Sequence, residues 1–273
     1  MPELPEVETV RRSLEPLLIG RTIMAAHIYY GGIIKKPSPE EFVNDVKGLR
    51  IEAIGRRGKY LLLELGGCRT LVIHLRMTGQ LTIVAEELPL PAHTHLVFVL
   101  DDGSELRFND VRKFGLVYLV SKDCLQEAGG LYTLGPEPLG DSFTEEYLKE
   151  KLLKKKVKLK AFLLDQTQIA GIGNIYADEA MFRAGLHPER VTASLKTAEI
   201  TRLFQAIRST LQEGVDFRGT SIRDYVDGQG EKGGFQDRLK VYGRAGKTCD
   251  CGVVLEKKTV AGRTTVYCPR CQI

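Results

Sequence analysis

Apolar residues recur at helical spacing at the start of the chain and then occur in short β-rich runs. Val7, Val10 and Leu14 share one face of a helix predicted from Pro5 to about Leu18. From there to about Val120 the pattern predicts strands, with one helix near Glu40–Val46 and a hairpin at Asp102-Gly103. The predicted strands are Thr22–Tyr30, Tyr60–Leu65, Thr70–Leu75, Leu81–Val84, His95–Leu100, Glu105–Phe108 and Leu116–Val120.

The second half of the chain has a helical period. The segment Gln126–Ser142 is rich in Gly and Pro and is typical of a linker. Thr144 then provides an N-cap followed by two acidic residues, and a helix is predicted to about Leu153. Further helices are predicted at Lys158–Asp165, Ile175–Ala184 and Thr197–Val215, and a Cys-rich tail begins near Leu239.

These patterns predict an α+β protein of several domains. We expect a β-sandwich with flanking helices over residues 1–125 and a linker over 126–140. Helices follow over 141–238, and a small ribbon occupies 239–273.

Composition places the chain among ordinary globular proteins, because 43% of its 273 residues are hydrophobic and 27% are charged. No apolar run approaches the ~18–20 residues needed to span a bilayer. The first twelve residues contain three glutamates where a secretory signal needs an apolar segment. The sequence therefore predicts a soluble, cytoplasmic protein.

The formal charge of +4 is mild, but it is unevenly distributed. Residues 149–160 contain seven lysines and one glutamate, and residues 238–273 contain eight basic and two acidic residues. A lysine run is usually a solvated helical face, and the turn Gly171-Ile-Gly173 before a predicted helix is a weak phosphate-binding signal alone. Together with a basic ribbon, they favour binding of a polyanion.

Four cysteines in the tail have the spacing of a zinc ribbon: Cys249, Cys251, Cys268 and Cys271. Four thiolates leave no open coordination position, so such a zinc is structural. The first pair is C-x-C where C-x-x-C is usual, which requires a tighter turn; a disulfide or unmetallated thiols are the alternatives. Predicted strands Val253–Val260 and Thr264–Tyr267 would place Arg263 near a hairpin tip, either solvated or directed at a phosphate.

The chain resembles the formamidopyrimidine-DNA glycosylase family over essentially its whole length. The resemblance is carried by many motifs in order: MPELPEVET (1–9), RRGKY (56–60), HLRMTG (74–79), HTH (93–95), DVRKFG (110–115), LGPEPL (134–139), GIGNIYADE (171–179), VYGR (241–244) and the Cys-rich ribbon. It implies a catalytic N-terminal domain, a helix-two-turn-helix DNA-binding domain and a zinc-ribbon hairpin. The expected partner is double-stranded DNA with an oxidised purine or an abasic site, bound by a monomer away from membranes.

The resemblance implies that Pro2, exposed after removal of Met1, is the nucleophile. An α-amine with a pKa of ~7.7–8.0 is roughly a tenth neutral at pH 7, far more than a lysine at ~10.4. A secondary amine that attacks sugar C1′ also forms a permanently charged iminium, which is an electron sink. Without the family motifs, Pro2 would be read as a proline that merely precedes a helix.

Other site residues are implied by the same resemblance. Glu3 would handle protons at the sugar ring oxygen, and Lys59 would be a second general acid that also contacts a phosphate. Arg263 would contact the phosphate and assist the later elimination. The residues expected to bind the DNA backbone are His74, His93, Arg112, Lys155, Lys160, Asn174 and Tyr242.

A base can react only after it leaves the stack, so the family fills the gap with a wedge. Met77, Arg112 and Phe114 match this wedge, and their types suit stacking and hydrogen bonding to the widowed partner base. A glycine-rich loop, which we expect to be mobile without the lesion, would close over the base. Its residues are Thr220, Ser221, Ile222, Arg223, Asp224 and Tyr225, with glycines following over 228–234.

The sequence therefore predicts a bifunctional DNA glycosylase and abasic-site lyase of base excision repair, with one structural zinc and no catalytic metal. It would remove 8-oxoguanine and formamidopyrimidines and cleave the strand by β,δ-elimination. An endonuclease VIII-like enzyme for oxidised pyrimidines is one alternative, although Leu4 and the glycine-rich loop favour purines. A catalytically inactive DNA-binding zinc-ribbon protein is the other.

Overall fold

A computed structural model describes residues 1–85 and 88–273 of the chain. It divides into two compact units, Met1–Tyr132 with Phe217–Gly234, and Thr133–Asp216 with Phe235–Ile273. The first boundary lies inside the segment 126–140 that was predicted as a linker. That segment is not extended coil throughout, since the short 3₁₀ helices η2 (Lys122–Glu127) and η3 (Gly129–Thr133) extend into it.

The segment Phe217–Gly234 belongs to the first unit, whereas the sequence grouped it with the helices of 141–238. Its backbone explains the difference, because the amide of Gly228 donates to Ser13 Oγ at 2.8 Å. The carbonyl of Gly228 also accepts from the amide of Ile83 at 2.9 Å. The ribbon residues 239–273 lie within the second unit and do not form a third.

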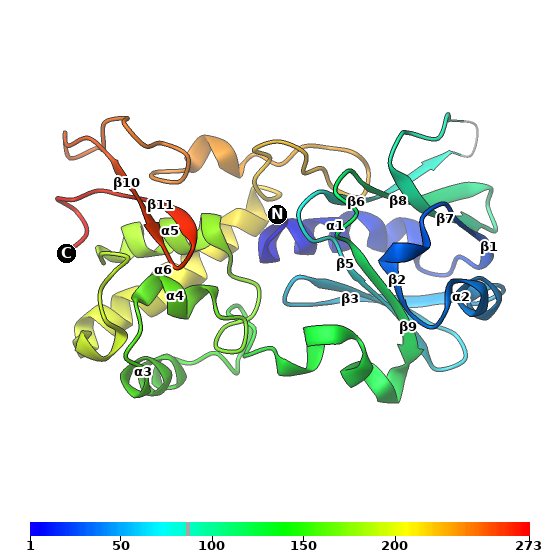
Figure 1. Ribbon diagram of the computed structural model, residues 1–273, viewed down its shortest axis with the longest axis horizontal. Coiled ribbons are helices and arrows are strands. Elements are labelled where there is room, and N and C mark those ends of the chain that lie inside the picture. The colour runs from blue at the N-terminus through cyan, green and yellow to red at the C-terminus, as the bar shows by residue number, and fades with distance from the viewer. Residues whose placement is uncertain (86–87) are drawn as a thin grey trace. The chain divides into compact units, whose positions relative to one another are not determined.

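The first unit contains two sheets that form a β-sandwich (Figure 1). The four-stranded sheet is antiparallel, and the five-stranded sheet has one parallel pair, between β2 and β9. In spatial order the sheets are β1 (Ile23–Ile28), β7 (Thr94–Leu100), β8 (Ser104–Asp110) and β6 (Gly79–Ala85); and β2 (Ile34–Lys36), β9 (Leu116–Ser121), β5 (Arg69–His74), β4 (Tyr60–Leu65) and β3 (Ile51–Arg57).

Helix α1 (Leu4–Leu18) contacts strands of both sheets, and its apolar face is fully buried in their common core (Figure 1). Helix α2 (Pro39–Val46) begins with a capping box between Ser38 and Glu41 and buries Phe42 in the same core. Both helices follow the periodicity of the sequence. Strand β3 was not predicted, because it is an edge strand in which mainly Ile51 and Ile54 are buried among polar residues.

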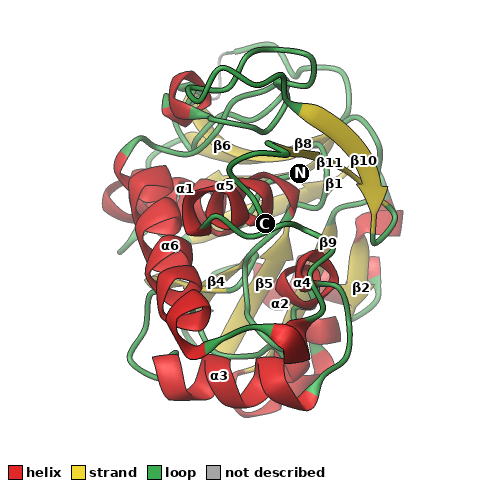
Figure 2. Cartoon of the chain, turned by 90° about the vertical axis from the view of Figure 1, so that its left-hand side faces the viewer, coloured by secondary structure: helices red, strands yellow, loops and turns green. Residues whose placement is uncertain are grey.

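The second unit is helical and carries a β-hairpin (Figure 2). The Thr144 hydroxyl caps the first helix, as the sequence predicts, and Gly185 ends the third in the left-handed conformation. The hairpin turns through Ala261-Gly262, both with positive φ, so that Arg263 is the first residue of its second strand. The elements are α3 (Glu145–Lys154), α4 (Leu159–Leu164), α5 (Asn174–Ala184), η4 (Thr192–Ser194), α6 (Thr197–Asp216), η5 (Phe235–Arg238), β10 (Glu256–Val260) and β11 (Arg263–Tyr267).

Within residues 1–85 and 88–273, we find no helix that is both long and apolar enough to cross a membrane. The longest helix, α6, is amphipathic and buries Leu203, Ile207 and Leu211 along one side. That side packs against α5 and α3, so the apolar residues of α6 serve the core of the second unit.

Candidate active site

The N-terminal segment is fixed by the first turn of α1. Glu3 is the N-cap residue, and its amide donates to Glu6 Oε2 at 2.8 Å, while its own carboxylate accepts from the amide of Glu6. Such a reciprocal capping box defines the direction in which the chain enters the helix. Pro2 and Glu3 are both buried, so the predicted nucleophile and its neighbouring acid lie together in a sheltered position.

Glu6 also connects the N-terminal segment to the predicted lesion loop, a role that the sequence did not reveal. Its Oε1 accepts from the amide of Thr220 at 2.7 Å, and its carbonyl accepts from the Tyr225 hydroxyl at 3.2 Å. A Cβ at Gly219 would lie 2.9 Å from Glu6 Cγ, and Gly219 has a φ of +79°, so glycine is required there. The loop therefore begins in direct contact with the base of α1.

The predicted loop residues form a closed turn whose tip is exposed. Ser221 Oγ donates to the carbonyl of Tyr225 at 2.8 Å, and the side-chain amide of Gln80 donates to the carbonyl of Asp224. Ile222, Arg223 and Asp224 form the exposed tip, whereas Tyr225 is buried. Gln80 lies at the start of β6, and nothing in its sequence context pointed to this contact.

Lys59 directly precedes strand β4, and His74 is the last residue of the neighbouring strand β5. Lys59 lies at the turn between β3 and β4 and is buried to 5% exposure. His74 lies opposite Tyr60 in the β4–β5 register, and the two rings meet edge to face at 4.5 Å. Because the amide of Arg76 donates to His74 Nδ1 at 2.9 Å, the imidazole proton is placed on Nε2.

Burial, assisted by the positive charges of Arg76 and Lys59, lowers the pKa of His74 to about 3. The imidazole is therefore neutral near pH 7 and can act only as a neutral Nε2–H donor. His93 differs, since it is exposed and has a φ of +67° in the turn before β7.

The three predicted wedge residues lie together. Arg112 Nη1 is 2.9 Å from Met77 Sδ, and the Arg112 guanidinium lies 4.6 Å from the centre of the Phe114 ring. Met77 is 39% exposed and Phe114 is 47% exposed, so two large apolar side chains project at the surface with a cation between them. Exposed apolar side chains next to a cation are of a type that can insert into an apolar base stack.

The other predicted site residues lie in the second unit, with Asn174 at the start of α5, Arg263 at the start of β11 and Lys155 at the end of α3. Asn174 Nδ2 donates to the carbonyl of Thr264 at 3.0 Å, directly after the exposed Arg263. Lys155 forms an ion pair with Asp165 at 3.1 Å. Glu179, another residue that the sequence did not single out, accepts from the amide of Tyr242 at 2.8 Å and also from those of Lys240 and Val241.

Lys160 is the one predicted DNA-binding residue that the structure contradicts. Its side chain has no exposed surface, and its Nζ lies 2.6 Å from Asp178 Oδ1 and 2.7 Å from Thr265 Oγ1. An ammonium held inside the protein by a carboxylate and a hydroxyl is not available to a phosphate. The assignment of Lys160 to the DNA backbone is therefore wrong, because one lysine of a basic run can point inward while its neighbours remain exposed.

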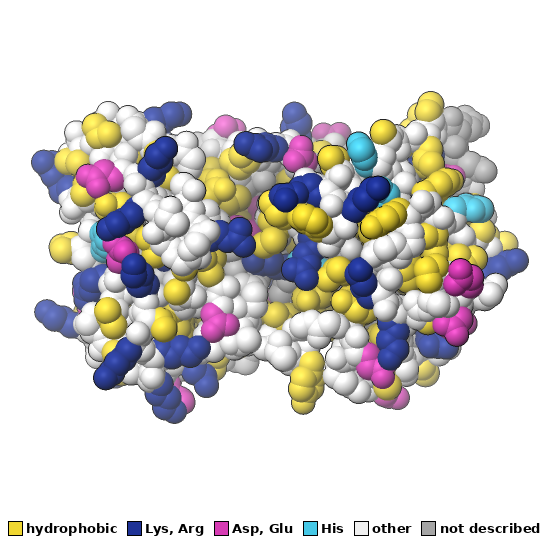
Figure 3. Space-filling model, viewed as in Figure 1, with side chains coloured by type: hydrophobic (Ala, Val, Ile, Leu, Met, Phe, Trp, Pro, Cys, Tyr) yellow, Lys and Arg dark blue, Asp and Glu magenta, His cyan; other side chains and the backbone are white. Residues whose placement is uncertain are grey.

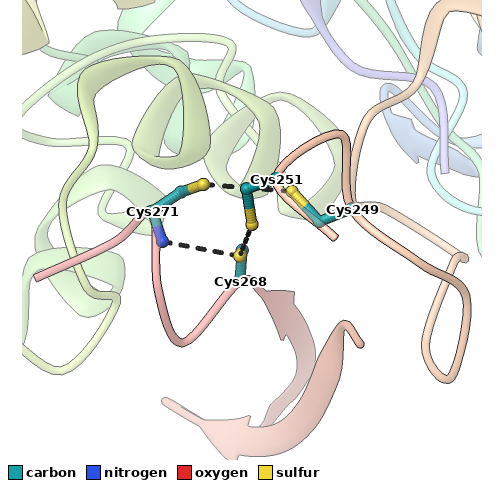
Figure 4. A group of neighbouring side chains, drawn as sticks. All are labelled: Cys249, Cys251, Cys268 and Cys271. Carbon is teal, nitrogen blue, oxygen red and sulfur yellow. Dashed lines mark hydrogen bonds between the residues drawn. The ribbon is translucent and has the colours of Figure 1, made fainter. Parts of the chain in front are cut away.

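The four cysteines of the ribbon converge on one point (Figure 4). All four Sγ atoms lie within 4.8 Å of one another, with Cys249–Cys271 at 3.9 Å and Cys251–Cys268 at 3.5 Å. A tetrahedral metal with bonds of about 2.3 Å requires sulfur–sulfur separations of roughly 3.8 Å, so the donor set fits one ion. The short C-x-C pair is accommodated by a turn in which Gly252 has a φ of +88°.

The matches to known proteins agree with this arrangement. The profile of the formamidopyrimidine-DNA glycosylase N-terminal domain matches residues 1–117, and that of the family's H2TH domain matches residues 134–226. The chain belongs to the formamidopyrimidine-DNA glycosylase family. It is 52% identical to the formamidopyrimidine-DNA glycosylases of Heliobacterium modesticaldum and Carboxydothermus hydrogenoformans, with 100% of each chain covered.

Solved structures of the formamidopyrimidine-DNA glycosylase family include complexes with DNA. A mutant Lactococcus lactis FPG bound to DNA containing Fapy-dG has a TM-score of 0.94 to this chain and 40% identity. The Lactococcus lactis Fpg bound to DNA with an abasic site has a TM-score of 0.93 and 39% identity, and both comparisons cover 99% of each chain. The chain is thus a DNA glycosylase of this repair family, and its solved neighbours bind DNA that contains Fapy-dG or an abasic site.

Proposed function

We propose that this protein excises oxidised purines, 8-oxoguanine and formamidopyrimidines, and then cleaves the DNA strand at the resulting abasic sugar. The observation that carries the proposal is the placement of Pro2 and Glu3 at the capped start of α1, tied through Glu6 to the loop at Thr220. A nucleophile, an acid and a base-covering loop are thereby joined in one unit of the protein.

In the proposed reaction, the lone pair of the Pro2 amine forms a bond to C1′, and the electrons of the glycosidic bond leave with the base. The new ammonium then loses its N–H proton, which balances the proton that the departing base takes up. Glu3 donates a proton to the ring oxygen O4′ as the C1′–O4′ bond opens, which gives an iminium. Since the nitrogen of a secondary amine has no proton left to lose, the iminium stays charged. It accepts electrons when a C2′ proton is removed.

Loss of that proton breaks the C3′–O bond and releases the 3′ phosphate, which is the β-elimination. In a second elimination the C4′ proton is lost, its electrons form a C4′–C5′ double bond as the C5′–O bond breaks, and the 5′ phosphate is released. Water then adds to C1′ and frees the Pro2 amine. Lys59 and Arg263 are proposed to neutralise the phosphates during these steps. His74 is proposed to donate its Nε2–H to the backbone as a neutral group, which agrees with its low pKa.

We also propose that the four cysteines bind one structural zinc ion and that the reaction needs no catalytic metal. Zinc holds a thiolate tetrad in place and contributes directly to the stability of such small ribbons. Elemental analysis of the purified protein should find one zinc per chain. Cys251→Ser should lower zinc occupancy and DNA affinity together, whereas Cys124→Ser, at a cysteine outside the cluster, should change neither.

The substrate class is tested by excision from duplexes that contain either 8-oxoguanine opposite cytosine or thymine glycol. We expect removal of 8-oxoguanine to be faster. The endonuclease VIII-like alternative predicts the reverse order. The inactive-protein alternative predicts DNA binding without excision, together with a mass spectrum that retains Met1.

A further inference from the structure

Asp110 is fully buried at the end of β8, and its carboxylate bonds to both chain segments that carry the wedge. Its Oδ1 accepts from the hydroxyl of Thr78, the residue directly after Met77, and from the amide of Arg112 at 3.2 Å. Its Oδ2 accepts from the amide of Gly115, directly after Phe114, at 2.7 Å. One carboxylate therefore spans two segments that are more than thirty residues apart in the chain.

The backbone of Asp110 is itself held in place. Its amide donates to the carbonyl of His93 at 2.9 Å, and its carbonyl accepts from His95 Nε2 at 2.8 Å and from the amide of Lys113 at 3.2 Å. The turn after Asp110 forms no helix or strand and includes Lys113 with a φ of +59°. Such a turn keeps its shape only where its surroundings fix it.

We propose that Asp110 is the positioning residue of the wedge, which joins the Met77 segment to the Arg112–Phe114 turn so that both enter the base stack as one rigid body. This inference rests on the proposed function. Thr78 takes part as a bridge, because its Oγ1 donates to Asp110 and accepts from the amide of Arg112 at 3.1 Å. Because its side chain is fully buried, Asp110 acts through the wedge, and only on steps that require the gap in the duplex to be filled.

The test compares two substrates with Asp110→Asn. The substitution keeps the size of the side chain but turns one acceptor oxygen into a donor, which opposes one of the three donors around it. An 8-oxoguanine duplex requires the wedge, whereas an abasic site in a single strand has no opposite base and no gap to fill. Misplacement of about 1 Å costs about 100-fold in rate, so we expect duplex excision to fall about 10- to 100-fold. Single-strand cleavage should stay within about twofold of wild type.

Thr78→Val provides a second variant, because it removes the bridging hydroxyl and leaves Asp110 in place. It should show the same selective loss to a smaller extent. The matched control is Asp101→Asn, at the opposite end of the same hairpin, where the carboxylate makes only a surface ion pair with Arg21 at 3.9 Å. The control should leave both reactions unchanged.

Fluorescence of 2-aminopurine placed opposite the lesion reports filling of the gap directly, and its change should be slowed in Asp110→Asn. The inference is overturned if folded Asp110→Asn excises from duplexes at the wild-type rate or loses both reactions equally. If Asp110→Asn does not fold, Thr78→Val decides by the same criterion. A wild-type protein that acts on neither substrate would contradict the proposed function instead.

Discussion

The imidazole of His74 shows how a single residue acquires its chemistry from its surroundings. It lies against Tyr60, accepts from the amide of Arg76, and has a pKa lowered to about 3 by burial and by two neighbouring cations. Its motif in the sequence identifies a candidate phosphate ligand but not its charge. That charge depends on the pairing of strands β4 and β5, which places Tyr60 opposite His74. Lys59 directly precedes β4 and Arg76 follows β5, so both cations lie near the imidazole.

The low pKa of His74 predicts a pH effect on stability. An unfolded histidine titrates near pH 6.5, so between that value and about pH 3 unfolding takes up a proton. Stability is therefore lost as the pH falls, by up to about 1.4 kcal/mol per pH unit. We expect the free energy of unfolding, measured by urea titration, to fall more steeply for the wild type than for His74→Gln as the pH is lowered from 7 to 4.

The difference between the free energies of unfolding of the two proteins isolates the contribution of His74, because the other titrating groups contribute equally to both. Burial raises the pKa of Asp178 to about 6 against the opposing effect of Lys160, which makes a contribution of opposite sign that is present in both proteins. Parallel pH dependences for wild type and His74→Gln would show that the imidazole is not held neutral.

At the scale of elements, the buried pair Lys160–Asp178 joins α4 to α5 and to the hairpin strand β11. Lys160 Nζ also contacts Thr265 Oγ1 at 2.7 Å, and Asp178 Oδ2 accepts from the amide of Val266 at 3.1 Å. The hairpin that carries Arg263 is thus attached to two helices by buried side chains, those of Lys160, Asp178 and Thr265. The pair therefore holds α4, α5 and the hairpin together from inside the unit.

Removal of one partner leaves the other charge buried and unpaired, which costs about 3–5 kcal/mol. We therefore expect Lys160→Ala to lower the free energy of unfolding by that amount in denaturant titrations, and Lys160→Met with Asp178→Leu to recover much of the loss. The control is Lys158→Ala, because water screens its exposed ion pair with Glu189 and the pair contributes little to stability. Equal effects of Lys158→Ala and Lys160→Ala would refute the role assigned to the buried pair.

The elements that the sequence predicts well are those with a strong local signal. The cap at Thr144 and the apolar stripe of α1 mark helices correctly, and the cysteine spacing predicts the cluster. Edge strand β3 was missed because only Ile51 and Ile54 of its residues are buried, too few to give a clear apolar alternation. The inward direction of Lys160 depends on Asp178, eighteen residues away, and no local pattern records that contact.

Site residues follow the same division. Met77, Arg112 and Phe114 match the wedge of the family, so the resemblance could propose their role, whereas it assigned none to Asp110, Thr78 and Glu6 in the same motifs. Asp110, Thr78 and Glu6 make their contacts through hydrogen bonds between segments distant in the chain. Those contacts become visible only when the sheets have formed, so the residues that hold the wedge and loop in place could not be inferred from spacing.

At the scale of the whole molecule, the net charge of +4 is the sum of two strongly basic segments, residues 149–160 and 238–273, and an acidic remainder. On the visible face of the helical unit, which carries α3 and the hairpin, most of the charged side chains are Lys or Arg (Figure 3). The remaining sequence outside residues 149–160 and 238–273 is acidic overall. Such a distribution favours a DNA affinity that depends on the release of counterions from phosphates.

This distribution predicts how salt affects binding. Each phosphate contact contributes about 0.9 to the slope of log K against log salt concentration, so Arg263→Ala and Lys155→Ala should each reduce the slope by about 1. Lys122→Ala, which removes a surface ion pair with Glu64 on the first unit, should leave the slope unchanged. Fluorescence anisotropy with an abasic-site duplex at several salt concentrations measures these slopes. Unchanged slopes for Arg263→Ala and Lys155→Ala would show that neither residue contacts a DNA phosphate.

The central claim is that the amine of Pro2 forms the covalent intermediate. Borohydride reduction during reaction with an 8-oxoguanine duplex, followed by proteolysis and mass spectrometry, locates the bond between protein and sugar. We predict a single adduct on the N-terminal peptide, at the nitrogen of Pro2, in protein from which Met1 has been removed. An adduct on Lys59 or another lysine, or no adduct with an intact Met-free N-terminus, would contradict the account.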